Sequence, residues 1–191
     1  MSEADEASVR YPGAILRPYG DLFPKIDPSA WIAPGVSVVG DVEIGPESSV
    51  FYGSVLRGDV HHIRVGARTN LQDQSTVHVT TDRFPTILED EITVGHRAVV
   101  HGCHVGEGAL IGIGAIVLDG AVVGEDALVA AGAVVRPGQV VPPATLWAGV
   151  PAKEVRPLTD DEIRLQRERT LTYVKTAAIH AASGGNPTGA L

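Results

Sequence analysis

Histidine residues are the feature of this sequence best suited to chemistry. The chain of 191 residues has seven: His61, His62, His78, His96, His101, His104 and His180. Imidazole nitrogens bind zinc and other first-row transition metals, and a catalytic zinc site often has three protein ligands and one open position. A metal centre therefore needs three of these side chains to converge, and which three depends on the fold.

A six-residue repeat predicts that fold. Aliphatic residues recur every six positions, with a small or β-branched residue four positions after many of them. The aliphatic positions are Ile32, Val38, Ile44, Val50, Leu56, Val65, Leu71, Val77, Val94, Val100, Val105, Ile111, Val117, Val123, Val129, Val135 and Val141. Neither a helix nor an ordinary strand has this period. It predicts a parallel β-helix from about residue 30 to 150, with three hexapeptides per coil and coils stacked about 4.8 Å apart.

The repeat is interrupted three times. Three extra residues separate Leu56 from Val65, and the step from Val100 to Val105 is one residue short. The segment 81–91 lacks the period, and we expect it to bulge from the surface. These interruptions are the places where we expect a site to be shaped.

A helix is expected after the coils. Thr159 and Glu162 form a capping box, which predicts a helix from Asp160 to about Ala182. The expected organisation is a disordered N-terminus (1–10), a β-helix domain (11–157), a C-terminal helix (158–182) and a flexible tail (183–191).

The register of the repeat selects three histidines. His78 and His101 both directly follow an aliphatic position, so both should point outward and stack in adjacent coils once the bulge absorbs its extra residues. His96 also points outward, but around a corner on the preceding face. A three-fold neighbour could bring His96 to the pair, which predicts a metal site between subunits. The alternative for any single one is an ordinary solvated histidine.

The remaining histidines and the cysteine have simpler interpretations. We expect His61 and His62, in the first interruption, and His180, late in the helix, to be ordinary surface residues. We expect His104 to take an inward, packed position. Cys103 could be a metal ligand, but a buried thiol is the favoured interpretation.

Composition argues against several partner classes. The net charge is −8 and no long basic run occurs, so nucleic acid and anionic membranes are not expected partners. No apolar run is long enough for a transmembrane helix, and we do not expect the acidic segment 1–10 to act as a secretory signal. The single Cys103 cannot form an internal disulfide, so a cytoplasmic location is expected.

Four segments resemble the gamma-class carbonic anhydrases: VLRGDV, TNLQDQSTVHV, ITVGHRAVVHGC and LWAGVPAKEVRPLT. The resemblance covers nearly the whole chain, and the paired histidines with a distant third are its specific part. It implies a left-handed β-helix and a homotrimer with three metal sites at subunit interfaces. In each site His78 and His101 come from one subunit and His96 from its neighbour, with Zn²⁺, Fe²⁺ or Co²⁺ as the metal.

The resemblance also implies roles for five further residues. Gln72 matches the glutamine that hydrogen-bonds the metal-bound hydroxide, and Asn70 matches a nearby active-site asparagine. A structural alternative for Asn70 is a corner position with left-handed backbone. Arg57 and Asp59 match an interface pair, with Arg57 also contacting bicarbonate. Tyr173 matches an active-site tyrosine.

The implied function is reversible hydration of CO₂ to bicarbonate. The sequence departs from the founding members of the family after His78, where the stretch VTTDRFPTILEDE is short, and Val60 stands where an acidic residue would follow Asp59. This places the chain in a short-loop subgroup. Two alternatives remain: an acyl-CoA thioesterase or acyltransferase built from hexapeptide repeats, and a structural homologue without catalytic activity.

Overall fold

The structure, a computed structural model, describes residues 10–183. The expected disordered N-terminus and flexible tail lie outside these residues, apart from their boundary residues Arg10 and Ser183. The elements run in the order β1 (Ile15–Arg17), β2 (Lys25–Ile26), β3 (Trp31–Ile32), β4 (Ser37–Ile44), β5 (Ser49–Val50), β6 (Val55–Val65), β7 (Asn70–Leu71), β8 (Thr76–His78), β9 (Thr86–Leu88), β10 (Thr93–Val94), β11 (Val99–His101), β12 (His104–Val105), β13 (Leu110–Ile111), β14 (Ile116–Val117), β15 (Val122–Val123), β16 (Leu128–Val129), β17 (Val134–Val135), β18 (Val140–Val141), β19 (Thr145–Ala148), β20 (Lys153–Pro157) and α2 (Asp160–Ser183).

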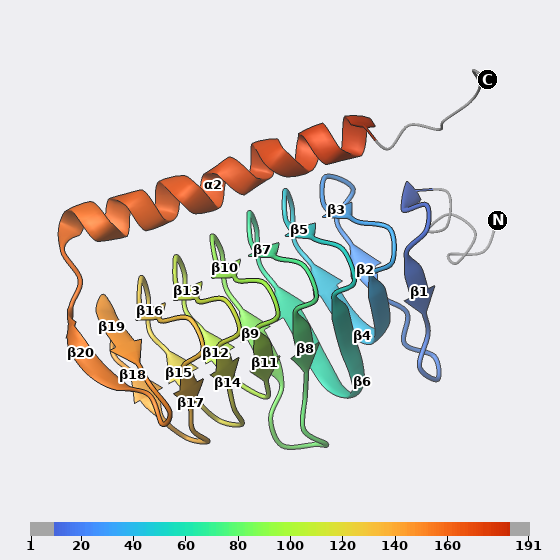
Figure 1. The fold of residues 1–191 in the computed structure, drawn as a ribbon. Coiled ribbons are helices and arrows are strands. Elements are labelled where there is room, and N and C mark those ends of the chain that lie inside the picture. The colour runs from blue at the N-terminus through green and yellow to red at the C-terminus, as the bar shows by residue number, and fades with distance from the viewer. Residues whose placement is uncertain (1–9, 184–191) are drawn as a thin grey trace.

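The strands form a prism with three faces (Figure 1). Face 1 contains the first halves of β4 and β6, then β8, β11, β14 and β17. Face 2 contains the second halves of β4 and β6, then β9, β12, β15 and β18. Face 3 contains β3, β5, β7, β10, β13, β16 and β19. Pairing between successive coils is parallel on every face, so the predicted β-helix with a C-terminal helix is confirmed.

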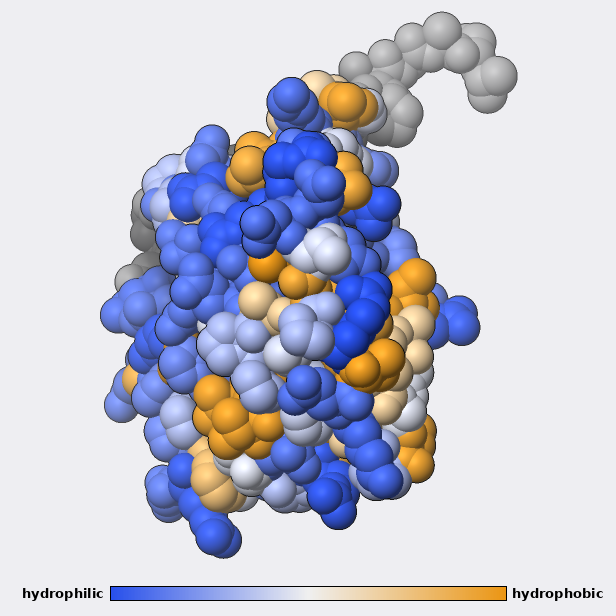
Figure 2. Space-filling model, turned by 90° about the vertical axis from the view of Figure 1, so that its left-hand side faces the viewer, coloured by the Kyte–Doolittle hydropathy of each residue, from blue (hydrophilic) through white to orange (hydrophobic). Residues whose placement is uncertain are grey.

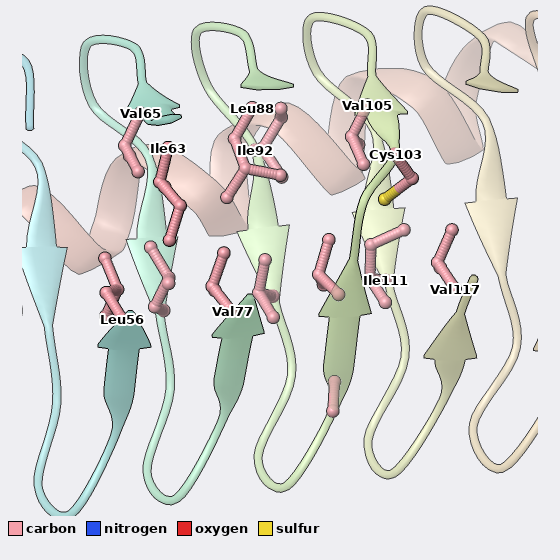
Figure 3. Packing of buried hydrophobic residues seen from close by; sticks show 14 of the residues in the cluster. Leu56, Ile63, Val65, Val77, Leu88, Ile92, Cys103, Val105, Ile111 and Val117 are labelled. Carbon is pink, nitrogen blue, oxygen red and sulfur yellow. The ribbon is translucent and has the colours of Figure 1, made fainter. Parts of the chain in front are cut away.

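The interior of the prism is filled by the repeated aliphatic positions. Val77, Val100 and Val117 have no exposed side-chain area and lie in successive coils of face 1 (Figure 3). Alanine occupies the small-residue position beside them, as at Ala98 and Ala115, which are also fully buried. Each coil alone would leave its apolar face in water, so stacking is what stabilises the repeat.

One expectation about the interruptions was wrong. Only the first part of 81–91 leaves the repeat, in a turn where Thr80 and Phe84 form an antiparallel bridge. The second part forms β9, which pairs with both β6 and β12, and its Leu88 is 1% exposed. A strand is needed there because the backbone groups of β6 and β12 would otherwise lack partners in the middle of face 2.

The other long interruption does not leave the prism. β6 continues as one strand from Val55 to Val65, and a register shift against β4 accommodates the extra residues. It therefore joins faces 1 and 2, and it carries Arg57 and Asp59 at the corner between them.

Helix α2 runs back along the β-helix and packs on face 3 (Figure 1). It begins with the expected capping box: the Thr159 backbone N–H donates to Glu162 at 2.9 Å, and the Glu162 N–H donates to Thr159 Oγ1 at 3.3 Å. The buried side chains of α2 are Gln166, Thr170 and Ala177. Within residues 10–183, no helix is long and apolar enough to cross a membrane.

The end of the β-helix next to β20 carries small, separate apolar patches among polar side chains (Figure 2). Exposed apolar residues of this region include Val140, Val150 and Val155. Because the patches are not contiguous, they do not mark a docking surface.

Candidate metal centre

His78 and His101 stand side by side at the corner between faces 1 and 2. They end β8 and β11, and the parallel register pairs them directly. Nδ1 of His78 lies 2.9 Å from Nε2 of His101. The stacking that the repeat predicts is therefore present.

A carboxylate binds the second ring nitrogen of each histidine. Nε2 of His78 lies 3.1 Å from Oδ1 of Asp59, and Nδ1 of His101 lies 2.5 Å from Oδ1 of Asp119. Burial raises the pKa of both carboxyl groups, but their hydrogen bonds outweigh it and the pKa of each is lowered. Both aspartates are thus ionised and can only accept, so each histidine donates a ring proton to its aspartate from the outer nitrogen.

In metal-ligating, neutral rings the two facing nitrogens would therefore both be acceptors. Two lone pairs 2.9 Å apart repel each other unless a proton or a cation lies between them. Burial lowers the pKa of His78, which favours the neutral ring that a metal ligand must be. Carboxylates behind ligating histidines are also the usual outer partners in metal sites. The donor set therefore fits a transition-metal cation.

Asp119 was missed by the sequence reasoning. It follows His101 by 18 residues, one full coil, and Thr80 Oγ1 donates to its other oxygen at 2.8 Å. The signal that would have found it is a carboxylate one coil after a candidate ligand.

Arg57 and Asp59 form an ion pair with each other on β6. The Arg57 side chain is 47% exposed, whereas that of Asp59 is 13% exposed. Within one chain, Asp59 therefore bridges the Arg57 guanidinium and the His78 ring.

A second group of candidate residues lies at the opposite edge of face 1, where face 3 ends. His96 follows β10, and its Nδ1 lies 2.8 Å from Oδ2 of Asp73 in the preceding coil. Gln72 is 6% exposed and its Nε2 lies 3.4 Å from Oδ1 of Asn70. Burial raises the pKa of Tyr173, and a hydrogen bond with Gln72 opposes that shift. Gln72, Asn70 and Tyr173 therefore form one cluster.

Asn70 does not occupy a corner. It lies in β7 and is 1% exposed, and the left-handed corner conformations next to it belong to Arg68 and Gln74. Its side chain is held by Thr93 Oγ1 at 2.8 Å. The structural alternative for Asn70 was wrong because strand alternation puts its side chain outward, beneath α2.

The two groups are half-sites at different corners of one chain. The chain turns at Arg97, where φ is 58°, and then crosses face 1 to reach His101. Within residues 10–183, no three His, Cys, Asp or Glu side chains converge as a metal site. A single chain thus holds a pair of ligands at one corner and a third candidate at another.

One other expectation failed in the interruption after Val100, whereas the favoured burial of Cys103 is confirmed. His104 is exposed and its Nε2 lies 2.8 Å from Glu89, whereas Cys103 takes the interior position at 3% exposure. Gly102, with φ of 56°, turns the backbone so that the residue after it faces inward. Burial raises the pKa of the Cys103 thiol to about 12, as expected for a thiol packed in the interior.

His180 is also not an ordinary surface residue. Its ring stacks on Trp31 at 5.3 Å, and its Nδ1 lies 2.9 Å from the Tyr52 hydroxyl. These contacts fasten the end of α2 to the first coils. His61 and His62 are half-buried, with their Nδ1 atoms 3.2 Å apart.

Comparison with known proteins places the chain in a family. A family model described as bacterial transferase hexapeptide (six repeats) matches residues 102–137. A probable carbonic anhydrase of Methanocaldococcus jannaschii is 52% identical over 75% of this chain and 90% of that protein. Gamma carbonic anhydrase 2, mitochondrial, of Arabidopsis thaliana is 46% identical over 85% of this chain. The chain belongs to the gamma carbonic anhydrase family.

Two further comparisons concern the length of the relatives and the activities assigned to them. The chain spans only 60% of the length of the Arabidopsis gamma carbonic anhydrase. A solved structure of a Bacillus cereus protein assigned to the acetyltransferases has 43% identity and a TM-score of 0.88, covering 90% of this chain and 99% of that one. The gamma carbonic anhydrase fold is therefore shared by proteins with different assigned activities.

Proposed function

We propose that this protein is a metal-dependent lyase that catalyses the reversible hydration of CO₂ to bicarbonate. The facing nitrogens of His78 and His101 carry the proposal, because two imidazole nitrogens 2.9 Å apart, on rings that are each held by a carboxylate, supply two ligands for one cation. Membership of a family whose relatives are named carbonic anhydrases supports the choice of reaction.

The proposed active form is a homotrimer. A ring of three chains would bring the corner with His96 against the neighbour's corner with His78 and His101, which forms three equivalent sites. The 43% exposed side chain of His96 is available for such a contact. The half-site geometry supports this arrangement because neither corner provides three ligands by itself.

The proposed metal is zinc, with Fe²⁺ or Co²⁺ as alternatives that suit imidazole ligands equally. When bound, such a cation supplies a nucleophile at neutral pH by lowering the pKa of water to about 7. Asp59 and Asp119 hold the two rings in the orientation that this requires.

The remaining candidates act around the reacting atoms. Gln72 accepts a hydrogen bond from the attacking oxygen and so orients it, Asn70 holds the amide of Gln72, and Tyr173 lies against that amide. The Arg57 guanidinium provides the positive charge that holds bicarbonate. A cytoplasmic location stays a prediction, since similar proteins include ones named mitochondrial.

Stopped-flow measurement of CO₂ hydration by the metal-loaded protein tests the proposal. We expect a rate above that of buffer, which the Gln72→Ala variant should reduce by about 100-fold, as for loss of a group that stabilises a transition state. A metal-loaded trimer with no rate above buffer would reject the proposal.

An acyl-CoA transferase or thioesterase is the second candidate, supported by the likeness to the Bacillus cereus protein assigned to the acetyltransferases. Turnover of acetyl-CoA by the same preparation, with no CO₂ hydration, would replace the first candidate. If the preparation shows neither activity, the remaining alternative is a structural homologue without catalytic activity.

A further inference from the structure

A chain of hydrogen bonds connects helix α2 to Gln72. Thr170 Oγ1 on α2 lies 2.8 Å from Thr93 Oγ1 on β10, although 77 residues separate them. Asn70 Nδ2 lies 2.8 Å from Thr93 Oγ1, and Gln72 Nε2 lies 3.4 Å from Asn70 Oδ1. The two threonines are buried, with 6% exposure for Thr93 and none for Thr170.

Two neighbouring backbone carbonyl oxygens indicate one direction along this chain of hydrogen bonds. Thr170 Oγ1 lies 3.1 Å from the backbone carbonyl oxygen of Gln166, which can only accept, so the Thr170 hydroxyl proton points there. Thr93 must then donate to Thr170, and Asn70 Nδ2 must donate to Thr93. Asn70 Nδ2 also lies 3.4 Å from the carbonyl oxygen of Ile92, which fixes the same orientation independently.

The orientation of the Gln72 amide follows from that of Asn70. With Nδ2 of Asn70 toward Thr93, its Oδ1 faces Gln72 and accepts from Nε2. Tyr173 lies against the same amide. Within the described part of the chain, Oε1 of Gln72 has no hydrogen-bond partner, so the amide presents an acceptor.

We propose that Thr93 and Thr170 are positioning residues, which hold Gln72 with its carbonyl oxygen toward the half-site that contains His96. They touch neither substrate nor metal and act only through Asn70 and Gln72. A carbonyl oxygen held in this way selects a hydrogen-bond donor, such as the O–H group of water or of bicarbonate. The expected effect on the rate of CO₂ hydration rests on the proposed function. The expected effect on the side-chain amides of Gln72 and Asn70 does not.

Four variants test the proposal. Thr93→Val and Thr170→Val remove one hydroxyl each and keep the side-chain shape, whereas Thr93→Ser keeps the hydroxyl. Thr172→Val is the matched control, because Thr172 donates to a helix carbonyl on the exposed side of α2. Trimer formation and metal content should be the same in all four variants.

The first measurement is hydrogen exchange of the side-chain amides by NMR. We expect the NH₂ groups of Gln72 and Asn70 to exchange at least about tenfold faster in Thr93→Val and Thr170→Val than in the unmodified protein, Thr93→Ser or Thr172→Val. Equal exchange in all five proteins would overturn the proposal, whether or not the protein hydrates CO₂.

The second measurement is the split between kcat and KM for CO₂ hydration. We expect about tenfold lower kcat with unchanged KM in both valine variants, and rescue to within about twofold in Thr93→Ser. Equal losses in Thr93→Val and Thr93→Ser would show a packing role and overturn the proposal. A lack of activity in the unmodified protein would instead reject the proposed function, and the amide exchange would still decide this inference.

Discussion

Nδ1 of His101 lies 2.5 Å from Oδ1 of Asp119, one full coil further along the β-helix. The repeat makes this contact, because coils that stack in register bring residues 18 positions apart onto the same corner. Asp119 thereby fixes which nitrogen of His101 faces His78. The six-residue period thus also decides the orientation of a candidate metal ligand.

Removal of Asp119 should weaken metal binding. We expect Asp119→Ala to lower metal affinity by about 10- to 100-fold, because the ring of His101 loses the partner that fixes its orientation. Metal content after competition with a chelator measures this. Glu89→Ala is the matched control, since Glu89 binds the exposed His104 in the same way. Equal metal retention by both variants would contradict the role of Asp119.

The strand β9 should be part of the core. We expect Leu88→Ala to lower the free energy of unfolding by about 2–5 kcal/mol, because its side chain is fully enclosed between coils. Ile87→Ala, at a half-buried outward position in the same strand, should lower the free energy of unfolding much less. Urea unfolding at one fixed protein concentration compares them, and equal losses would argue that β9 is not packed as described.

The start of α2 should make stability depend on pH. The hydrogen bonds from Arg156 first, and then from the Thr159 backbone, lower the pKa of Glu162 to about 2 from a usual value of 4.5. Because the folded pKa is the lower one, the contribution of Glu162 is full above pH 4.5 and disappears as pH falls toward 2. The Tm difference between the unmodified protein and Glu162→Gln should therefore shrink over that window. A difference that stays constant from pH 7 to 3 would contradict the assignment.

The period of six predicts most of the fold because each interior position depends only on its own coil. It predicts Val77, Val100 and Val117 as interior residues, and from them the outward stacking of His78 and His101. The period fails as a guide where a strand is needed to supply hydrogen-bond partners to the neighbouring coils. Leu88 is in the core because β6 and β12 need a strand between them, and that need is not visible in the local pattern.

Contacts with α2 could not be predicted from the repeat at all. The stacking of His180 on Trp31 and the Thr93–Thr170 bond depend on where the helix lies along face 3. A helix with a weakly patterned sequence does not specify that position by periodicity. The exposure of His104 escaped prediction for a different reason, because it depends on the local turn at Gly102.

The central claim is that each metal site combines His78 and His101 of one chain with His96 of the next. Metal content of trimers mixed from His78→Ala and His96→Ala chains tests it most directly. Each variant alone should bind no metal. In equimolar mixed trimers about one interface in four should join an intact pair to an intact His96, so about a quarter of the metal content should return. Mixed trimers that bind no more metal than either variant alone would contradict a site shared between subunits.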